Sequence, residues 1–280
     1  MSQHRTFQDV KIFGERNTST NAIKLLVERN SASRVLPSTA IELDPYFRAK
    51  VQMISWLPSG VRVKAYRAYV DSVFEKQRDP RYIWKHAMLN NIDQAAFSDC
   101  LVILTFRHPA SWLLALQRKP HHHLQDVPAD FMEFLKQPWK PTRRDNVAGP
   151  LSVFDLYGNK VHAALDFAAR RDRAGNAYAI VRFEDFAVDQ EAVFDGLRPW
   201  LREPAATFTP IESSTKDVTK NRKWYADFYG NNRWSDELGG EAAAIINRCI
   251  SWGELSQLNY TALSVAESKT ESAKPVAEIP

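Results

Sequence analysis

Short apolar runs that do not alternate with polar residues constrain the fold of this chain more than any other feature. Four of them are typical of buried strands, at residues 10–13, 81–84, 101–106 and 177–183. Apolar residues at helical spacing lie between them, at residues 20–29, 61–76, 110–117 and 151–171. Strands that are apolar on both faces and alternate with helices are typical of a parallel sheet covered on both sides. The sequence therefore predicts an α/β fold, a three-layer parallel sheet flanked by helices with right-handed crossovers.

The rest of the chain is predicted to be less regular. Five prolines between residues 118 and 150 indicate a long loop with one short helix, and residues 203–234 indicate a second long loop. A helix is expected over residues 235–252, and its apolar face is formed by Leu238, Ala242, Ile245, Ile246 and Cys249. Beyond about residue 262 the composition turns to Ser, Glu, Lys and Pro. We therefore expect a single domain over residues 1–262 and a disordered tail over residues 263–280.

The composition narrows the class of protein. The net charge of +4 is mild, whereas a nucleic-acid-binding protein more often shows a stronger basic bias with aromatic residues interleaved along a strand or groove, so we expect no nucleic-acid partner. Two distant cysteines exclude a disulfide framework and fit a reducing compartment. The first residues are polar and no apolar run is long enough to cross a bilayer. We therefore expect a cytoplasmic protein without a signal peptide or a transmembrane segment.

The stretch "VKIFGERNTSTNAIKLL", residues 10–26, places a polar turn between a predicted strand and a predicted helix. Backbone N–H groups in such a turn and the positive end of the helix dipole suit a phosphate or a sulfate. The turn departs from the P-loop pattern G-x-x-x-x-G-K-[ST], which begins here at Gly14. Ser19 stands at the second glycine, Thr20 stands at the lysine, and the cation has moved to Arg16.

A second departure concerns the metal. A magnesium-dependent P-loop enzyme places an acidic residue at the end of a neighbouring strand, but the strand at residues 101–106 is followed by Arg107. A cation at that point repels Mg²⁺ and attracts a further anionic group. The run 121–123 consists of three histidines, but consecutive positions rarely converge on one ion, and the flanking residues favour a solvated loop. We therefore expect an anion site that works without metal.

These motifs resemble those of sulfotransferases that use 3′-phosphoadenosine 5′-phosphosulfate (PAPS). "FGERNTSTNAIKLL" resembles the 5′-phosphosulfate loop, in particular the "GERNSGTN" form of bacterial members, and "TFRHPASWLLALQRKPHH" resembles the 3′-phosphate motif. "VRFEDF" is similar to a later strand that closes the nucleotide pocket, and residues 220–223 are similar to a basic loop that caps it. The resemblance spans residues 8–260 and implies a fold like that of the P-loop nucleotide kinases, PAPS as the donor, and no metal.

The resemblance also implies roles for individual residues. Those implied to cradle the 5′-phosphosulfate are Arg16, Asn17, Thr18, Ser19, Thr20 and Asn21. Those implied at the 3′-phosphate or around the nucleotide are Arg107, Ser111, Arg182, Arg222 and Lys223. The catalytic residues are implied to be Lys85, His86 and Arg16. Two positions depart from the family, which usually has Gly where Ser19 stands and Ser where Ala115 stands, so Ser111 is the candidate substitute.

The proposed chemistry assigns a task to each member of the catalytic pair. An acceptor hydroxyl or amine must lose a proton, and His86 suits a general base, while Lys85 would stabilise charge on the bridging oxygen. Adjacent residues of a strand point to opposite faces, so the chain must turn after Trp84 for both to reach one site. The acceptor could be a carbohydrate, a lipid or a small metabolite, in a pocket shaped by residues 32–60 and 118–150.

Two other functions are compatible with the sequence. The Ser19 and Ala115 departures allow a non-catalytic nucleotide-binding or scaffold relative. A P-loop phosphotransferase is a further alternative, although Thr20 and Arg107 argue against it. Five aromatic residues could line a substrate or adenine pocket or pack as ordinary core: Trp224, Tyr225, Phe228, Tyr229 and Trp234.

Overall fold

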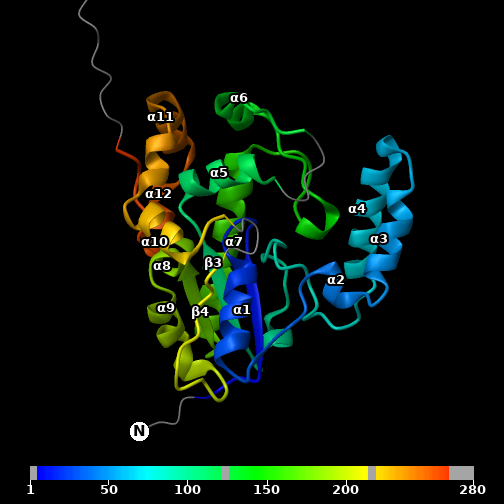
Figure 1. Ribbon diagram of the computed structural model, residues 1–280, viewed down its shortest axis with the longest axis vertical. Coiled ribbons are helices and arrows are strands. Elements are labelled where there is room, and N and C mark those ends of the chain that lie inside the picture. The colour runs from blue at the N-terminus through cyan, green and yellow to red at the C-terminus, as the bar shows by residue number, and fades with distance from the viewer. Residues whose placement is uncertain (1–4, 121–125, 214–218, 265–280) are drawn as a thin grey trace, which may run out of the picture.

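The computed structural model describes residues 5–120, 126–213 and 219–264 of the chain. Its centre is a sheet of four strands, β1 (Asp9–Gly14), β2 (Arg34–Val35), β3 (Cys100–Phe106) and β4 (Tyr178–Arg182). The strands lie in the order β2-β1-β3-β4, and each neighbouring pair is parallel. The protein therefore has the expected α/β fold with a parallel sheet flanked by helices (Figure 1).

The helices of the described residues connect and cover these strands. They are α1 (Thr20–Asn30), α2 (Ala40–Leu43), α3 (Phe47–Ser55), α4 (Ser59–Glu75), α5 (Pro109–Arg118), α6 (Phe131–Lys136), α7 (Val153–Arg173), α8 (Phe183–Val188), α9 (Gln190–Leu197), α10 (Arg222–Gly230), α11 (Gly240–Cys249) and α12 (Trp252–Leu255). Side chains of a strand alternate between the two faces of the sheet. Val10 and Ile12 accordingly pack with α1 and α9, whereas Phe13 belongs to the core formed with α5 and α7.

Three of the four predicted strands are confirmed, but the prediction of a strand at residues 81–84 is wrong. That segment forms turns. The Arg81 N–H donates to Asp79 Oδ1 at 2.9 Å instead of to a neighbouring strand. β2 occupies the start of this edge of β1, where Val10 lies opposite Val35, and at the end of β1 the Gly14 N–H donates to the Lys85 carbonyl oxygen at 3.0 Å. β2 has only two residues, which is too short for an apolar pattern to reveal.

The irregular segments were predicted in part. Residues 118–150 contain the one short helix expected there, α6, together with the 3₁₀ turn η2 (Arg143–Asp145). Residues 203–234 hold an unexpected helix, α10, whose first turn is capped by Asn221 accepting from the Trp224 N–H at 2.9 Å. Helix α11 begins later than expected and buries Ala242 and Ile246, while Cys249 is exposed. The predicted tail falls largely at residues 265–280, outside the described residues.

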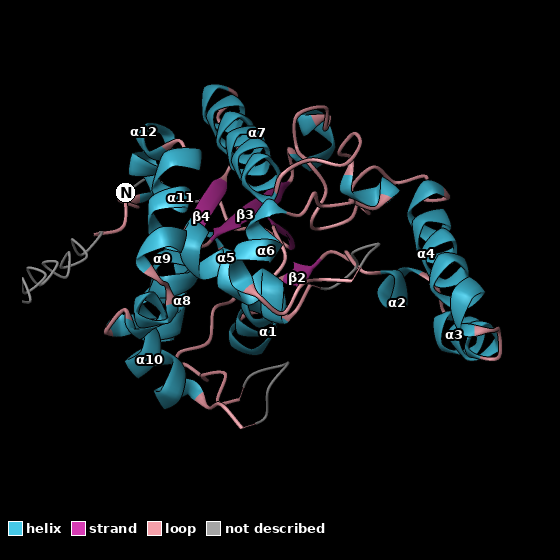
Figure 2. Ribbon diagram, turned by 90° about the horizontal axis from the view of Figure 1, so that it is seen from above, coloured by secondary structure: helices cyan, strands magenta, loops and turns pink. Residues whose placement is uncertain are grey.

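The order of the strands creates a crevice. The chain runs from β1 to β2 on one side of β1, and β3 lies on the other side of β1. Ligands of open α/β sheets bind where the order reverses in this way, at the carboxyl ends of the strands. Figures 1 and 2 show that α3 and α4 form a hairpin that extends away from the sheet, on the far side of α2.

Candidate anion-binding site

The turn that follows β1 has a backbone that few residues tolerate. Asn17 and Ser19 have φ angles of 65° and 67°, in the left-handed region that favours glycine. Ser19 is the position at which the resembling family usually has Gly. Gly14 is required for a different reason, because a Cβ added there would lie 1.8 Å from Thr105 Oγ1. The close approach of β1 to β3 at this point brings the turn against the end of β3.

The loops that leave β1 and β3 are bonded to each other. Arg107 Nη1 donates to the carbonyl oxygen of Asn17 at 2.9 Å, and Trp112 Nε1 donates to that of Arg16 at 2.9 Å. Both donors belong to the chain after β3, and both acceptors belong to the turn after β1. The two loops therefore form one unit at the reversal point of the sheet.

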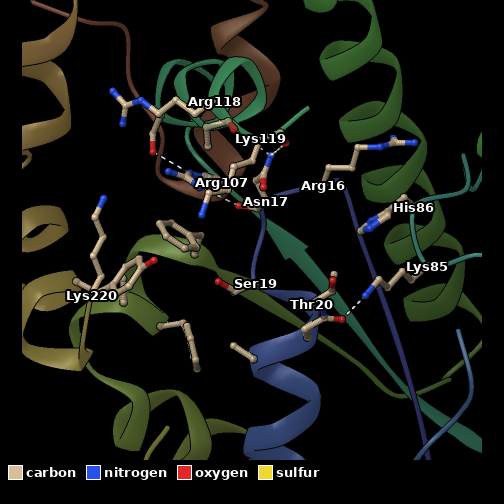
Figure 3. A pocket seen from close by; sticks show the side chains of 18 of the residues that line it. Arg16, Asn17, Ser19, Thr20, Lys85, His86, Arg107, Arg118, Lys119 and Lys220 are labelled. Carbon is tan, nitrogen blue, oxygen red and sulfur yellow. Dashed lines mark hydrogen bonds between the residues drawn. The ribbon is translucent and has the colours of Figure 1, made fainter. Parts of the chain in front are cut away.

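A cavity of about 520 Å³ opens at this unit, which is within the usual range of ligand pockets, roughly 300–1,000 Å³. Seven of its described lining residues are basic and one is acidic. The basic residues are Arg16, Lys85, Arg107, Arg118, Lys119, Lys220 and Arg222, and the acid is Glu237. Aromatic side chains form another part of the wall: Phe183, Tyr225, Phe228, Tyr229 and Trp234. The cavity therefore combines positive charge with flat apolar surface (Figure 3).

Arg107 is a buried cation held entirely by neutral groups. Its side chain donates to Ser111 Oγ at 2.8 Å, to the carbonyl oxygen of Asn17 at 2.9 Å and to the Tyr229 hydroxyl at 2.7 Å. Its guanidinium carbon lies 4.1 Å from the centre of the Phe183 ring. The residue is 6% exposed, and none of the described carboxylates forms an ion pair with it. A buried charge without a counter-charge is costly, so an anionic ligand would be strongly favoured beside it.

Arg16 has the opposite surroundings. Its Nη2 donates to both Asp145 oxygens at 2.7 and 2.8 Å, its Nη1 donates to Glu15 at 2.8 Å, and its side chain is 1% exposed. Lys160 Nζ lies 2.6 Å from the second Glu15 oxygen. Figure 3 shows the Arg16 side chain pointing away from Arg107. Arg16 therefore lines the cavity with a guanidinium committed to two carboxylates, and this geometry does not support the prediction that Arg16 grips the phosphosulfate.

Lys85 and His86 both line the cavity. The chain turns at these two residues, as expected if both side chains are to reach one site. Lys85 Nζ donates to Asn21 Oδ1 at the start of α1. His86 Nδ1 is hydrogen-bonded to the carbonyl oxygen of Gly14, which can only accept, so the proton of the neutral ring lies on Nδ1 and Nε2 is left as the acceptor. Burial first, and the Lys85 charge second, hold the pKa of His86 well below its usual 6.5. The ring is therefore neutral at pH 7.

The structure brings most of the other predicted residues to the same cavity. Lining it are Asn17, Ser19, Thr20, Asn21, Ser111 and Arg222. Thr18 is not part of the wall, because its hydroxyl is bonded to the Glu15 carbonyl oxygen at 2.6 Å and to Thr105 Oγ1 at 2.7 Å. Arg182 is also absent from the wall, since it donates to the Leu258 carbonyl oxygen at 3.1 Å and to Asp185 at 2.8 Å.

Lys223 is exposed on α10 and does not reach the wall either. The geometry therefore does not support the nucleotide-binding roles expected for Arg182 and Lys223, nor a role for the Thr18 hydroxyl in ligand contact. Four of the five aromatic residues noted in the sequence do line the cavity, and Trp224 does not.

Two basic wall residues were missed by the sequence reasoning. Arg118 lies seven residues after Ser111 and Lys119 follows it, at the end of α5. Residues seven apart share one face of a helix, so extending the face of Ser111 along α5 would have found Arg118. By contrast, no local signal connects Asp145 to Arg16, because 129 positions separate them.

The described residues hold neither a cluster of metal ligands nor a membrane-spanning helix. In the ranges given above, no group of three or more His, Cys, Asp or Glu side chains is arranged to hold a metal ion. No helix in the described part of the chain is both long and apolar enough to span a bilayer. The three consecutive histidines lie within residues 121–125, outside the described residues.

The site is a basic and aromatic cavity of about 520 Å³ at the carboxyl ends of parallel strands. No protein-family model matches this chain, and no curated protein matches it in sequence. Among solved structures, it is similar to a retinol dehydratase crystallised with androsterone and the inactive cofactor PAP. That similarity has 13% sequence identity and a TM-score of 0.43, and it covers 89% of this chain and 80% of the other.

Proposed function

We propose that this chain is a sulfotransferase that moves a sulfuryl group from PAPS to a hydroxyl or an amine. The observation that carries the proposal is the buried Arg107 guanidinium, which lines the cavity with neutral partners and has no carboxylate partner among the described residues. The turn between β1 and α1, which lacks the P-loop lysine, supports the same proposal. The resemblance of these two motifs to PAPS-binding loops specifies the ligand.

The residues of the cavity fit the donor. Arg107 suits the 3′-phosphate, since a planar guanidinium can donate parallel hydrogen bonds to an oxyanion. The turn at Ser19 and Thr20 suits the 5′-phosphosulfate, because the first N–H groups of α1 have no helical acceptor. The Tyr225 and Phe228 rings in the wall suit the adenine. When bound, PAPS would supply an activated sulfuryl group with a good leaving group, and no metal is needed in this proposal.

The catalytic residues would act on the acceptor and on the leaving oxygen. Neutral His86, with its proton on Nδ1, offers Nε2 to take the proton of an acceptor hydroxyl or amine. Lys85, held by Asn21 beside the first turn of α1, would stabilise negative charge at the bridging oxygen. Arg16 would position the turn through its ion pairs and would not contact the ligand.

The acceptor side of the cavity is largely apolar. Ile41, Phe47, Tyr66 and Val70, from the segment containing α2, α3 and α4, form this part of the wall. A wall of this kind suits an acceptor with an apolar portion next to its hydroxyl or amine. Among carbohydrates, lipids and small metabolites, we therefore favour a lipid or an apolar metabolite.

The first test is binding without metal. Titration calorimetry with 3′-phosphoadenosine 5′-phosphate in EDTA should show a specific complex. Arg107→Ala should weaken it by roughly 10- to 150-fold, since a hydrogen bond to a charged group contributes about 1.5–3 kcal/mol. The affinity for adenosine 5′-phosphate, which lacks the 3′-phosphate, should fall much less on the same substitution.

The matched control is Arg182→Ala, which removes an equivalent side chain outside the cavity wall and should leave nucleotide affinity unchanged. Equal losses for the two nucleotides on Arg107→Ala would overturn the assignment of the 3′-phosphate. Binding that requires Mg²⁺ would favour a phosphotransferase.

The second test is turnover. Wild-type protein supplied with PAPS labelled in its sulfuryl group should transfer the label to an acceptor from a panel of apolar alcohols and amines. His86→Ala should abolish transfer while nucleotide affinity is retained. Nucleotide binding without transfer to any acceptor would identify the non-catalytic relative instead.

A further inference from the structure

The α3–α4 hairpin ends in a surface that the rest of the protein does not cover. Each residue from 55 to 64 is exposed, and α3 has no buried residue. Figures 1 and 2 both show the hairpin standing apart from the layers that enclose the sheet. Its tip is therefore in contact with solvent.

The tip carries large apolar side chains, which is unusual for a solvated turn. Trp56 is 77% exposed, Met53 is 64% exposed and Val61 is 53% exposed, and Leu57 and Val63 are exposed beside them. Met53 of α3 and the C-cap residue Trp56 are three residues apart and so lie on one face at the end of that helix. A group of large exposed apolar side chains marks an interaction site, whereas single scattered ones are ordinary surface.

The charge of the hairpin specifies its partner. Residues 45–70 contain five basic residues, Arg48, Lys50, Arg62, Lys64 and Arg67, and no acidic residue. Lys50 is paired with Asp44 at 2.7 Å, just before the hairpin. Within the described ranges, no carboxylate forms an ion pair with Arg48, Arg62 or Lys64. The apolar tip is thus flanked by uncompensated positive charge.

Apolar residues with an exposed tryptophan and basic flanks are typical of segments that lie in the headgroup region of a negatively charged membrane. A second copy of the chain fits less well, because a symmetric contact would bring the same cations together. We propose that the tip of the α3–α4 hairpin docks on an anionic lipid bilayer. Trp56 and Leu57 would enter the headgroup region, and Arg62 and Lys64 would contact lipid phosphates.

The helices that carry the proposed lipid-facing tip also line the cavity. Tyr66 and Val70 of α4 and Phe47 of α3 line the cavity. The same two helices therefore join the lipid-facing tip to the acceptor side of the cavity. The link between the tip and the acceptor side rests on the proposed function, whereas the docking itself does not.

Sedimentation of the full chain with vesicles tests the docking directly. The protein should bind vesicles of phosphatidylcholine mixed with phosphatidylserine and bind phosphatidylcholine alone weakly, with affinity falling as salt rises. Each basic side chain near such a surface contributes about fivefold in partitioning, so Arg62→Gln with Lys64→Gln should lower binding about 25-fold. Trp56→Ser should also lower binding, because it removes the most exposed apolar side chain.

Two matched controls isolate the hairpin. Lys136→Gln removes an exposed lysine on α6, and Val188→Ser removes an exposed apolar side chain at the end of α8. Both should bind vesicles like the wild type, and circular dichroism should show that all variants keep the fold, since the changed side chains are exposed.

Failure to bind the anionic vesicles, or equal binding by hairpin and control variants, would overturn the proposal. A different result would assign the tip to a contact with a second copy of the chain. In that case the protein would not bind vesicles but would self-associate in sedimentation velocity, and Trp56→Ser would abolish the self-association. The vesicle result does not depend on binding of 3′-phosphoadenosine 5′-phosphate. Failure of the docking proposal and failure of the proposed enzyme activity are therefore distinguishable.

Discussion

The buried carboxylate of Asp145 is expected to be among the residues on which stability depends most. It is fully buried in η2 and accepts from Arg16 Nη2, from the Thr142 N–H and hydroxyl, and from Trp84 Nε1. Asp145 and Glu15 together balance Arg16 and Lys160 within one buried cluster. Asp145→Asn keeps the size of the side chain but leaves one positive charge uncompensated.

The expected cost of this change is large. Removing one partner of a buried ion pair costs about 3–5 kcal/mol, because the remaining charge cannot be hydrated. The matched control is Asp195→Asn, which breaks a pair with Arg198 at 2.8 Å, close to the 2.7 Å of the Arg16–Asp145 pair, but Asp195 is 56% exposed. An exposed pair contributes about 0–1 kcal/mol. Urea denaturation at pH 7, followed by tryptophan fluorescence, should separate the two variants by at least about 2 kcal/mol.

The pH dependence provides a second measurement on the same variant. Burial acts to raise the pKa of Asp145, but the charges of Arg16 and Lys160 hold it well below its ordinary value of 3.8. A carboxyl with a depressed folded-state pKa stabilises the protein above pH 3.8 and loses that contribution as the pH falls below it. The difference in stability between wild type and Asp145→Asn should therefore shrink below pH 3.8. Equal losses for Asp145→Asn and Asp195→Asn at pH 7 would refute the reasoning.

Further predictions concern the turn after β1, the two buried histidines and the grip on Arg107. Ser19→Gly should raise the unfolding free energy by about 1 kcal/mol, since a left-handed non-glycine residue costs about that much; Ser98→Gly, at a φ of −63°, should show no gain. Burial lowers the pKa of His108 to about 4, so this residue should contribute a fall in stability of about 1.4 kcal/mol per pH unit from pH 6.5 down to 4, and His108→Gln should remove that contribution. Because His86 stays neutral well below pH 6.5, the sulfotransfer rate should lack an acid limb near 6.5; a limb at that pH would exclude His86 as the base. Tyr229→Phe should weaken 3′-phosphorylated nucleotides less than Arg107→Ala does, because two of the three contacts to the guanidinium survive.

The sequence predicted those parts of the fold that local patterns specify. The strands at β1, β3 and β4 were found because each is a short and mostly apolar run, and α1 was found from its apolar face. Residues 81–84 carry a similar pattern, but their apolar side chains pack beside the sheet without pairing with it. That difference depends on β2 occupying the edge of β1, which is a long-range contact.

The residues of the candidate site were likewise predictable only where a local pattern marks them. Arg107 and the Lys85–His86 pair follow apolar runs, and the structure places all three residues in the wall of the cavity. The surroundings of Arg16 were not predictable, because Asp145 comes from a turn far along the chain. Whether a cation meets a ligand or an internal carboxylate depends on such distant contacts and not on its own motif.

The direct bonding of the loops after β1 and β3 has a consequence for ligand kinetics. With Arg107 already fixed on the Asn17 carbonyl oxygen, arrival of an anion requires little ordering of these loops, so little of the interaction energy is lost to immobilising them. Substitutions in this unit should therefore change mainly how long a nucleotide stays rather than how fast it arrives. The residence time of the proposed nucleotide would then be set by contacts that are already assembled before it enters.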